Sequence, residues 1–511
     1  MKLIHAFKQN NEKSYYEEPL VSENTFINAE ADMSALPEFA KNADKLPSPL
    51  WDGHKSYIDC YWKAWEIAFS NLRSPMAGTG FVSPYIDPAF NGCTFMWDSV
   101  FMLMFGKYAD RIFKFQGTLD NFYSHQHKDG YICRQIEEAS GDDTYTRHDP
   151  SSTGPEVMPW CEWEYYLSFG DKERLARVFP CLLAYHRWMK EHFTWRDGTY
   201  FSSGFGCGMD NIPRLEPGYH CYFSHGHMVW VDSCMQELFS CNTLIKMAKE
   251  IGREEFVAEL LEEYDHLFKV INETLWDENT NFYYDLWKNG KLNGIKHIGA
   301  YWSLLAKCVP EERAEAFIAH LENENEFKTD HRVPTLSKDS EFFEEEGKYW
   351  CGSIWSPTNY MVLRGLDEYK KYSLSHEIAL NHLNAVVGAF ERENTLFENY
   401  APIFKDGKPV RGNWSKSDFV GWTGLSPISV LFEFVFGIKP DVSENKIVWN
   451  VNLLDKHGVE KYPFGKDGEL TLICNERKSA SDEPRIIAKS NIPLTLEIMW
   501  NGASESKIMK L

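Results

Sequence analysis

The sequence lacks closely paired cysteines and long apolar runs. Its 12 cysteines are scattered and none forms a C-x-x-C pair, which excludes a zinc ribbon or a thioredoxin-type motif and indicates reduced, buried thiols. No window reaches the roughly eighteen apolar residues of a membrane span. The first residues, 1–11, contain too few apolar side chains for a secretory signal. We therefore expect a cytoplasmic protein, with a periplasmic location as the alternative.

Positive charge is in short supply. There are 53 Lys and Arg residues against 75 Asp and Glu residues, giving a formal net charge of −22. Such a balance disfavours a protein that follows nucleic-acid phosphates or an anionic membrane surface. We expect a small, neutral partner, neither nucleic acid nor membrane. The sequence leaves the oligomeric state open.

Aromatic residues, by contrast, are abundant. They make up 15% of the chain, with 18 Trp and 25 Tyr. Trp and Tyr combine a flat apolar face with a polar tip, which suits sugar rings whose C–H faces stack while their hydroxyls need partners. Large helical cores collect the same residues, so composition alone fits both a carbohydrate site and a big core.

Helical periodicity dominates residues 51–438. Apolar residues recur at three- and four-residue spacing in the segments 55–72, 99–115, 159–169, 172–191, 228–251, 254–274, 310–321, 356–367 and 369–391. Short aromatic turns at 193–201 and 275–284 separate helices, as expected where an outer helix is followed by an inner one. The pattern predicts an all-α toroid of paired helices.

The two ends of the chain differ from this helical region. β-branched or alternating runs at 446–451, 468–474, 485–489 and 493–500 are separated by Gly, Asp and Ser turns. They predict a small antiparallel β appendage over 439–511, packed on the helices. Residues 1–50 are polar and without a clear period, so we expect an irregular arm.

One candidate acid lies in a glycine-rich stretch at 204–214. Three glycines in five residues make a poor helix interior and favour a loop that brings backbone close to another group. The loop presents Asp210, followed by Asn211, Pro213 and Arg214, whose charge can hold a carboxylate or a hydroxyl-rich ligand. Asp210 is interpreted either as a proton donor or as an Asx-turn residue that caps its own backbone.

A second carboxylate, Glu398, lies near the end of the helical region. It sits between Phe397 and Tyr400 in a segment that leaves a helix and ends in proline. An apolar wall raises the pKa of a carboxyl group, and nearby donors lower it. We interpret Glu398 as a general base or, alternatively, as a salt-bridge partner.

Other loops carry possible sugar-binding side chains. Trp97 is a stacking platform and Asp98 an acceptor for two adjacent hydroxyls, although Asp98 also suits an N-cap for a helix starting at Ser99. Further loops of the same kind contain Gln126, Trp160, Trp355 and Trp422. Each loop by itself is an ordinary turn between helices, but together they predict a cup at one mouth of the toroid.

Five stretches, in order, resemble a known enzyme group. Phe-Met-Trp-Asp at 95–98, Gly-Met-Asp-Asn-Ile-Pro-Arg at 208–214, the Trp-x-Pro of 352–360, Leu-Phe-Glu-Asn-Tyr at 396–400 and Gly-Trp-Thr at 421–423 are similar to motifs of trehalases and glycoside hydrolase family 63. That family includes processing α-glucosidase I and bacterial mannosylglycerate and glucosylglycerate hydrolases. The resemblance spans about residues 90–430 of the chain. Two departures concern the substrate: Ile212 replaces the family's usual Ser, and a different segment, 404–414, replaces the trehalase glycine-rich run.

The resemblance implies an (α/α)6 barrel and an inverting exo-acting α-glycosidase. Asp210 would be the general acid and Glu398 the general base, about 6.5–9.5 Å apart to leave room for water. No metal or organic cofactor is implied. The residues that would wall the pocket or hold sugar hydroxyls are Trp97, Asp98, Gln126, Trp160, Arg214, Trp355 and Trp422.

Other readings remain open from sequence alone. An epimerase or phosphorylase on the same fold would use histidines in the cup, and His125, His127, His225 and His227 lie in or beside these loops. A sugar-binding protein without catalysis is a further alternative. Glucose and mannose are both compatible with the motifs. The acidic charge disfavours an anionic aglycone such as glycerate, although Arg214, Lys408 and Arg411 can compensate locally.

Overall fold

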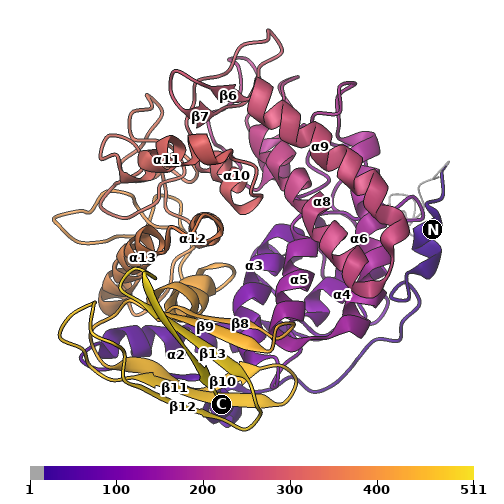
Figure 1. Cartoon of the computed structure of the whole chain (residues 1–511). Helices are drawn as coiled ribbons and strands as arrows, with labels where there is room; N and C mark the ends of the chain where they lie inside the picture. The colour runs from indigo at the N-terminus through magenta and orange to yellow at the C-terminus, as the bar shows by residue number, and fades with distance from the viewer. Residues whose placement is uncertain (1–15) are drawn as a thin grey trace.

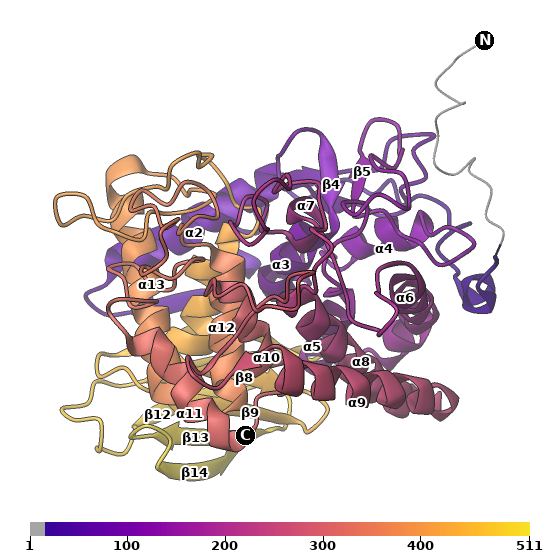
Figure 2. The same cartoon turned by 90° about the horizontal axis from the view of Figure 1, so that it is seen from above.

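The computed structural model describes residues 16–511, shown in Figures 1 and 2. Residues 1–15 of the expected arm, including the segment assessed for a secretory signal, lie outside the described residues. The arm then contains short helices: η3 (Pro19–Glu23), α1 (Phe39–Asn42) and η4 (Ala43–Lys45). All 12 cysteines of the chain are free. Within 16–511 no helix combines the length and apolarity that crossing a bilayer requires.

Helices are the main secondary structure between residues 55 and 435. The longer ones are α2 (Lys55–Ser70), α3 (Met96–Gly106), α4 (Gly117–Ser124), α5 (Met158–Phe169), α6 (Lys172–His192), α8 (Val231–Ile251), α9 (Val257–Thr274), α11 (Glu311–Ala319), α12 (Ser356–Glu368), α13 (Tyr372–Glu393) and the π-helix η10 (Ser426–Val435). The shorter ones are η5 (Lys107–Ala109), α7 (Gly204–Cys207), η6 (Glu254–Phe256), η7 (Ile298–Tyr301), α10 (Trp302–Leu305), η8 (His320–Glu322) and η9 (Thr423–Leu425).

The helices contact one another in a closed series. α3 packs on α5, α5 on α8, α8 on α10, α10 on α12, and α12 on η10, which returns to α3. Other helices lie outside this circuit: α6 packs on α5 and α8, α9 on α8, and α13 on α12 and η10. Figure 1 shows the resulting ring, with α3, α5, α8, α10 and α12 toward its centre. These contacts separate an inner set of helices from an outer set.

Burial follows the position of a helix in the ring. Every residue of the inner helix α3 is buried, which is typical of a helix that is apolar on all sides. The outer helix α9 buries one stripe, Leu260, Glu263, Leu267 and Ile271, at three- and four-residue spacing. α4, α10 and η10 were not among the predicted helices; α10 has only four residues, and every residue of η10 is buried.

The strands after residue 437, together with β1 (Ser48–Trp51), form two four-stranded sheets. Their strands are β8 (Ile438–Asp441), β9 (Lys446–Val451), β10 (His457–Phe464), β11 (Gly468–Cys474), β12 (Ile486–Ser490), β13 (Thr495–Trp500) and β14 (Glu505–Lys510). One sheet has the order β1-β10-β11-β12 and is antiparallel; the other has the order β14-β13-β9-β8.

Two features of these sheets differ from the sequence-based expectation. β9 and β13 run parallel, with Lys446 opposite Thr495, so the prediction of a purely antiparallel appendage is wrong for this pair. β1 (Ser48–Trp51) comes from the segment expected to be irregular and pairs with β10. The partners in each pair lie far apart in the sequence, so the pairing leaves no local signal.

Two-residue and three-residue strand pairs connect the helices. They are β2 (Leu72–Arg73) with β3 (Tyr85–Ile86), β4 (Cys93–Phe95) with β5 (Gln135–Glu137), and β6 (Trp276–Asp277) with β7 (Phe282–Tyr283). Figure 2 shows β4, β5 and α7 at the end of the helices opposite β8–β14. The candidate site lies at the end of the helices where β4, β5 and α7 are found.

Candidate active site

A cavity of about 310 Å³ opens among these connecting segments. It is lined by Phe90, Asn91, Phe95, Trp97, Asp98, Arg134, Gln135, Tyr145, Gly154, Pro155, Phe205, Gly208, Asp210, Tyr349, Trp350, Glu398 and Trp422. Cavities of about 670 and 950 Å³ lie elsewhere, so size does not single this one out. It is distinguished by bringing together Asp98, Asp210 and Glu398, the three carboxylates of the sequence motifs, in an aromatic wall. We call it the carboxylate cavity.

The glycines of the acid loop allow close backbone packing. A Cβ on Gly204 would lie 2.1 Å from the carbonyl oxygen of Asp210, and one on Gly208 would lie 3.1 Å from the Trp97 ring. Gly208 also has φ +75°, a left-handed conformation that favours glycine. The predicted loop contains one helical turn, α7, because the Ser203 hydroxyl accepts a hydrogen bond from the Gly206 N–H and caps it.

The Asp210 carboxyl group favours its protonated form. Burial raises its pKa from the ordinary 3.8 to about 7; the positive charge of Arg134 opposes this rise and the negative charge of Glu398 adds to it. Within the described residues no other residue donates a hydrogen bond to this carboxylate, so the Asx-turn interpretation finds no support. A protonated carboxyl group at neutral pH is what a general acid requires.

Glu398 is held more firmly than Asp210. Its Oε1 accepts a hydrogen bond from the Tyr349 hydroxyl at 2.9 Å, and its Oε2 accepts one from the Lys416 backbone N–H at 3.1 Å. Its own carbonyl accepts the Trp422 indole N–H at 2.9 Å. Burial raises the pKa of Glu398 above its ordinary value, while the Lys416 and Tyr349 donors lower it. Within residues 16–511 it has no salt-bridge partner, so the salt-bridge interpretation finds no support.

A short hydrogen-bonded path joins the acid loop to the Glu398 side. The Asn211 amide donates to the Lys348 carbonyl at 3.1 Å, and its oxygen accepts the Trp350 N–H at 2.8 Å. Tyr349 lies between these two anchors with φ +63°, a strained conformation for a non-glycine residue. The anchors therefore fix the one residue whose hydroxyl contacts Glu398.

Trp97 and Asp98 reach the cavity from the first turn of α3. The helix begins at Met96 with Phe95 as its N-cap, so the interpretation of Asp98 as the N-cap is wrong. Pairing of Phe95 with Gln135 between β4 and β5 brings Arg134 to the same place. Burial raises the pKa of Asp98 well above its ordinary value, and the negative charges of Glu398 and Asp210 add to the rise.

Arg134 is a lining residue that the sequence analysis did not single out. Its Nε donates to the Ser151 carbonyl at 2.6 Å and one terminal nitrogen donates to the Tyr145 hydroxyl at 2.9 Å. The guanidinium lies 4.7 Å from the Tyr145 ring centre and 5.6 Å from that of Phe205. It supplies a fixed positive charge opposite Asp210. In the sequence, the only indication of this role is that Arg134 ends a segment, 126–134, with several polar residues around Asp129 and Gly130.

Two predicted hydroxyl-binding residues do not line the cavity. Arg214 is 1% exposed and forms ion pairs with Asp232 and Asp285, which occupy its guanidinium. Gln126 is buried and donates to the carbonyls of Gly130 and Cys181. These predictions are wrong because both side chains bind protein groups that are distant in the sequence.

Two predicted tryptophans also lie behind the wall. Trp160 packs edge-on against Trp302, and its indole N–H donates to Glu164 at 3.3 Å. Trp355 stacks at 3.9 Å on Trp350, which does line the cavity. Both predictions of direct sugar contact are therefore corrected to packing roles.

The structure also places Ile212 and the four histidines considered in the sequence analysis. Ile212, the departure next to the acid, is 2% exposed and outside the lining, so it supports the loop from within. None of His125, His127, His225 and His227 lines the cavity. His127, for example, contacts Asp143 at 2.7 Å. The histidine chemistry considered for an epimerase therefore has no side chain at this site.

Comparison with known proteins places the chain in a family. A family model described as the mannosylglycerate hydrolase MGH1-like glycoside hydrolase domain matches residues 93–423. The chain belongs to this family. This glycoside hydrolase domain contains all three cavity carboxylates and Trp422. The motif resemblance and the prediction of an enzyme of this class are confirmed.

Individual relatives of this glycoside hydrolase are distant. The chain is 24% identical over 378 residues to an uncharacterized protein of Borreliella burgdorferi, covering 73% of this chain and 77% of the relative. It is 23% identical over 355 residues to a probable mannosyl-oligosaccharide glucosidase of Schizosaccharomyces pombe, covering 62% of this chain. The chain spans only 39% of that yeast protein's length.

Solved structures share the fold of this glycoside hydrolase. The family 63 mannosylglycerate hydrolase of Thermus thermophilus, in complex with Tris, matches with a TM-score of 0.57 at 20% identity, over 72% of this chain and 99% of that one. The neutral trehalase of Saccharomyces cerevisiae matches with a TM-score of 0.53 at 14% identity, over 69% and 73% of the two chains. The likeness extends to both enzyme groups suggested by the motifs.

Proposed function

We propose that this protein hydrolyses a small α-linked glucoside or mannoside with inversion at the anomeric carbon. The observation that supports this most is the contrast between two carboxyl groups in one cavity. Asp210, without a donor from another residue, has a pKa of about 7, whereas Glu398 accepts two hydrogen bonds that favour its charged form. Groups whose environments differ in this way suit acid and base roles.

The proposed reaction uses one proton transfer at each face of the sugar. Protonated Asp210 gives its proton to the glycosidic oxygen as the bond to the anomeric carbon breaks. Glu398 removes a proton from a water molecule that attacks the same carbon from the opposite face. The products are a β-configured sugar and the free aglycone, and exchange with solvent restores both carboxyl groups.

The other cavity residues would bind substrate. Trp97 and Trp422 offer ring faces to a sugar, and Asp98 accepts hydrogen bonds from its hydroxyls. Arg134 offers a positive charge that would favour an anionic group on the aglycone. A volume of about 310 Å³ suits a single sugar unit at the reaction centre, in keeping with exo action.

We further propose that the closed circuit of inner helices and their outer partners is an (α/α)6 barrel. The support is the order of contacts from α3 through α5, α8, α10 and α12 to η10. The fold likeness to the family 63 and trehalase structures supports the same conclusion. In this architecture the carboxylate cavity lies at the mouth formed by loops that precede the inner helices.

The direct experiment compares wild type with Asp210→Asn and Glu398→Gln. Each is incubated with trehalose, glucosylglycerate, mannosylglycerate and other α-linked disaccharides, and released sugar is followed by NMR. We expect cleavage by wild type and a loss of about 10²–10⁴-fold in each variant. Glu393→Gln, an exposed residue at the end of α13, is the matched control and should retain activity. Equal rates in all four proteins would refute the assignment of both carboxylates.

A further inference from the structure

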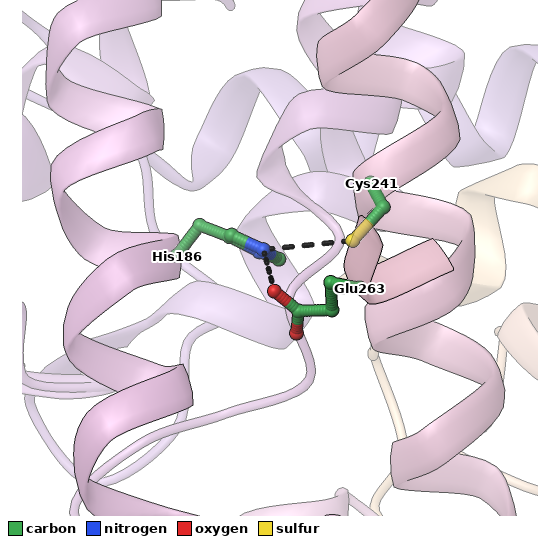
Figure 3. Close-up of side chains that lie close together, drawn as sticks. All are labelled: His186, Cys241 and Glu263. Carbon is green, nitrogen blue, oxygen red and sulfur yellow. Dashed lines mark hydrogen bonds and ion pairs between the residues drawn. The ribbon is translucent and has the colours of Figure 1, made fainter. Parts of the chain in front are cut away.

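A second group of reactive side chains lies between three helices, away from the carboxylate cavity. His186 of α6, Cys241 of α8 and Glu263 of α9 converge on one point, as Figure 3 shows. His186 Nε2 lies 3.2 Å from Glu263 Oε2 and 3.6 Å from Cys241 Sγ, and all three ligand atoms lie within 4.8 Å of one another. We call these residues the His186 cluster.

The spacing of these atoms matches a tetrahedral metal site. With zinc–ligand bonds of usual length, nitrogen and oxygen ligands lie about 3.3 Å apart, and nitrogen and sulfur ligands about 3.6 Å apart. The two distances from His186 Nε2 agree with these values. A direct N–H to carboxylate hydrogen bond is usually shorter, about 2.7–2.9 Å. Histidine, cysteine and glutamate together favour zinc.

The other ring nitrogen of His186 has the partner that a metal-bound histidine normally has. His186 Nδ1 lies 2.9 Å from Glu156 Oε2, and Glu237 Oε2 lies 3.5 Å from the same nitrogen. A carboxylate at this position fixes the ring and leaves Nε2 as the metal ligand.

An independent observation points to a missing cation. Glu156 and Glu237 are 1% and 2% exposed, yet Glu156 Oε1 and Glu237 Oε2 have no hydrogen-bond partner among the described residues. Buried carboxylate oxygens without partners are costly unless positive charge is nearby. With Glu263, three carboxyl groups therefore face two cationic side chains, His186 and Lys190, whose Nζ lies 2.9 Å from Glu263 Oε2.

We infer that His186, Cys241 and Glu263 bind one zinc ion, with water as the fourth ligand. Binding displaces the proton of the Cys241 thiol and the proton on His186 Nε2, so two protons are released to solvent for each ion bound. Lys190 Nζ now lies 2.9 Å from Glu263 Oε2, and its half-exposed side chain moves toward solvent to free that oxygen.

The site is separate from the proposed hydrolysis. It joins residues of α6, α8 and α9. It also lies next to the carboxylate cavity wall, because Glu156 directly follows the lining residues Gly154 and Pro155. On its other side, the Tyr200 hydroxyl donates to Glu263 in the segment that leads into α7. Metal binding would therefore stabilise two segments of the cavity.

The first test uses the full-length wild-type protein. Metal analysis of purified protein should find about one zinc per chain, and a chelator should remove it and lower the midpoint of thermal unfolding. Zinc added back should restore the midpoint with release of two protons, measured by titration calorimetry in buffers of different ionisation enthalpy. Cobalt added instead should give a thiolate-to-cobalt charge-transfer band in the near ultraviolet, which reports the Cys241 bond directly.

Variants then assign the site. Cys241→Ser should lose the cobalt band. Cys161→Ser changes an equally buried cysteine, in α5, and should keep the band. Glu156→Gln should weaken zinc binding about 10- to 100-fold while keeping the band. Absence of the band in folded wild type, or its persistence in Cys241→Ser, would overturn the proposal. Because the band is measured on wild type, the proposal can still be refuted if a variant fails to fold.

Discussion

Replacing Asp210 with asparagine should make the protein more stable at neutral pH while it abolishes activity. The native carboxyl group, with a pKa of about 7, holds its proton in a pH range where an unfolded chain with the ordinary value of 3.8 has lost it. The native state therefore binds more protons between these values, and wild-type stability falls as pH rises through that window. Asparagine has no charge to lose, so the variant escapes this penalty.

The size of the effect follows from the pKa of Asp210. A rise from 3.8 to about 7, at about 1.36 kcal/mol per pKa unit, corresponds to an upper bound of about 4 kcal/mol. The side chain is only part-buried and faces an open cavity, so solvent screening reduces this to about 2 kcal/mol. The advantage of the variant should be absent near pH 4 and complete above about pH 7.

The assay is urea unfolding of both proteins, followed by tryptophan fluorescence at about pH 5 and about pH 8. Contributions from titrating groups that do not interact with Asp210 cancel in the difference between the two proteins. Asp59→Asn, on the exposed surface of α2, is the matched control for the loss of a carboxyl group. A difference for Asp210→Asn that is constant with pH, or that favours wild type at high pH, would refute the raised pKa of Asp210.

Three further perturbations test the surroundings of the two carboxyl groups. Tyr349→Phe removes a donor that lowers the pKa of Glu398, so the acidic limb of the kcat/KM profile should move to higher pH; an unchanged limb would contradict this role. Trp97→Ala should mainly raise KM, and a large loss in kcat at unchanged KM would contradict a binding role. Gly208→Ala should lower stability by about 1–3 kcal/mol, measured by urea unfolding, because φ is +75° and Cβ would press on Trp97; no change would refute that strain.

Local sequence patterns were sufficient to predict part of the structure. Periodic helices such as α6 and α9 were predicted within a few residues, because their apolar residues recur at three- and four-residue spacing. The acid loop was located through its glycines, and the structure shows the close contacts, with Trp97 and the Asp210 carbonyl, that require them. In such cases the physical cause lies within a few residues of the feature.

The errors share a different cause. Arg214 and Gln126 have the right chemistry for binding sugar hydroxyls, but partners far along the chain, Asp285 and Cys181, occupy them. Arg134 enters the cavity only because β4 pairs with β5. The parallel pairing of β9 with β13 likewise depends on long-range contacts. Which polar side chains face a cavity is decided by tertiary packing, which one sequence read locally does not contain.

The most direct test of the account is the anomeric configuration of the first product. Wild type and Asp210→Asn are incubated with the α-linked panel below about pH 7, where Asp210 is protonated, and the released sugar is observed by NMR before it mutarotates. We predict the β-anomer from wild type and no release by the variant. Release of the α-anomer, or equal release by both proteins, would contradict the roles of Asp210 as acid and Glu398 as base.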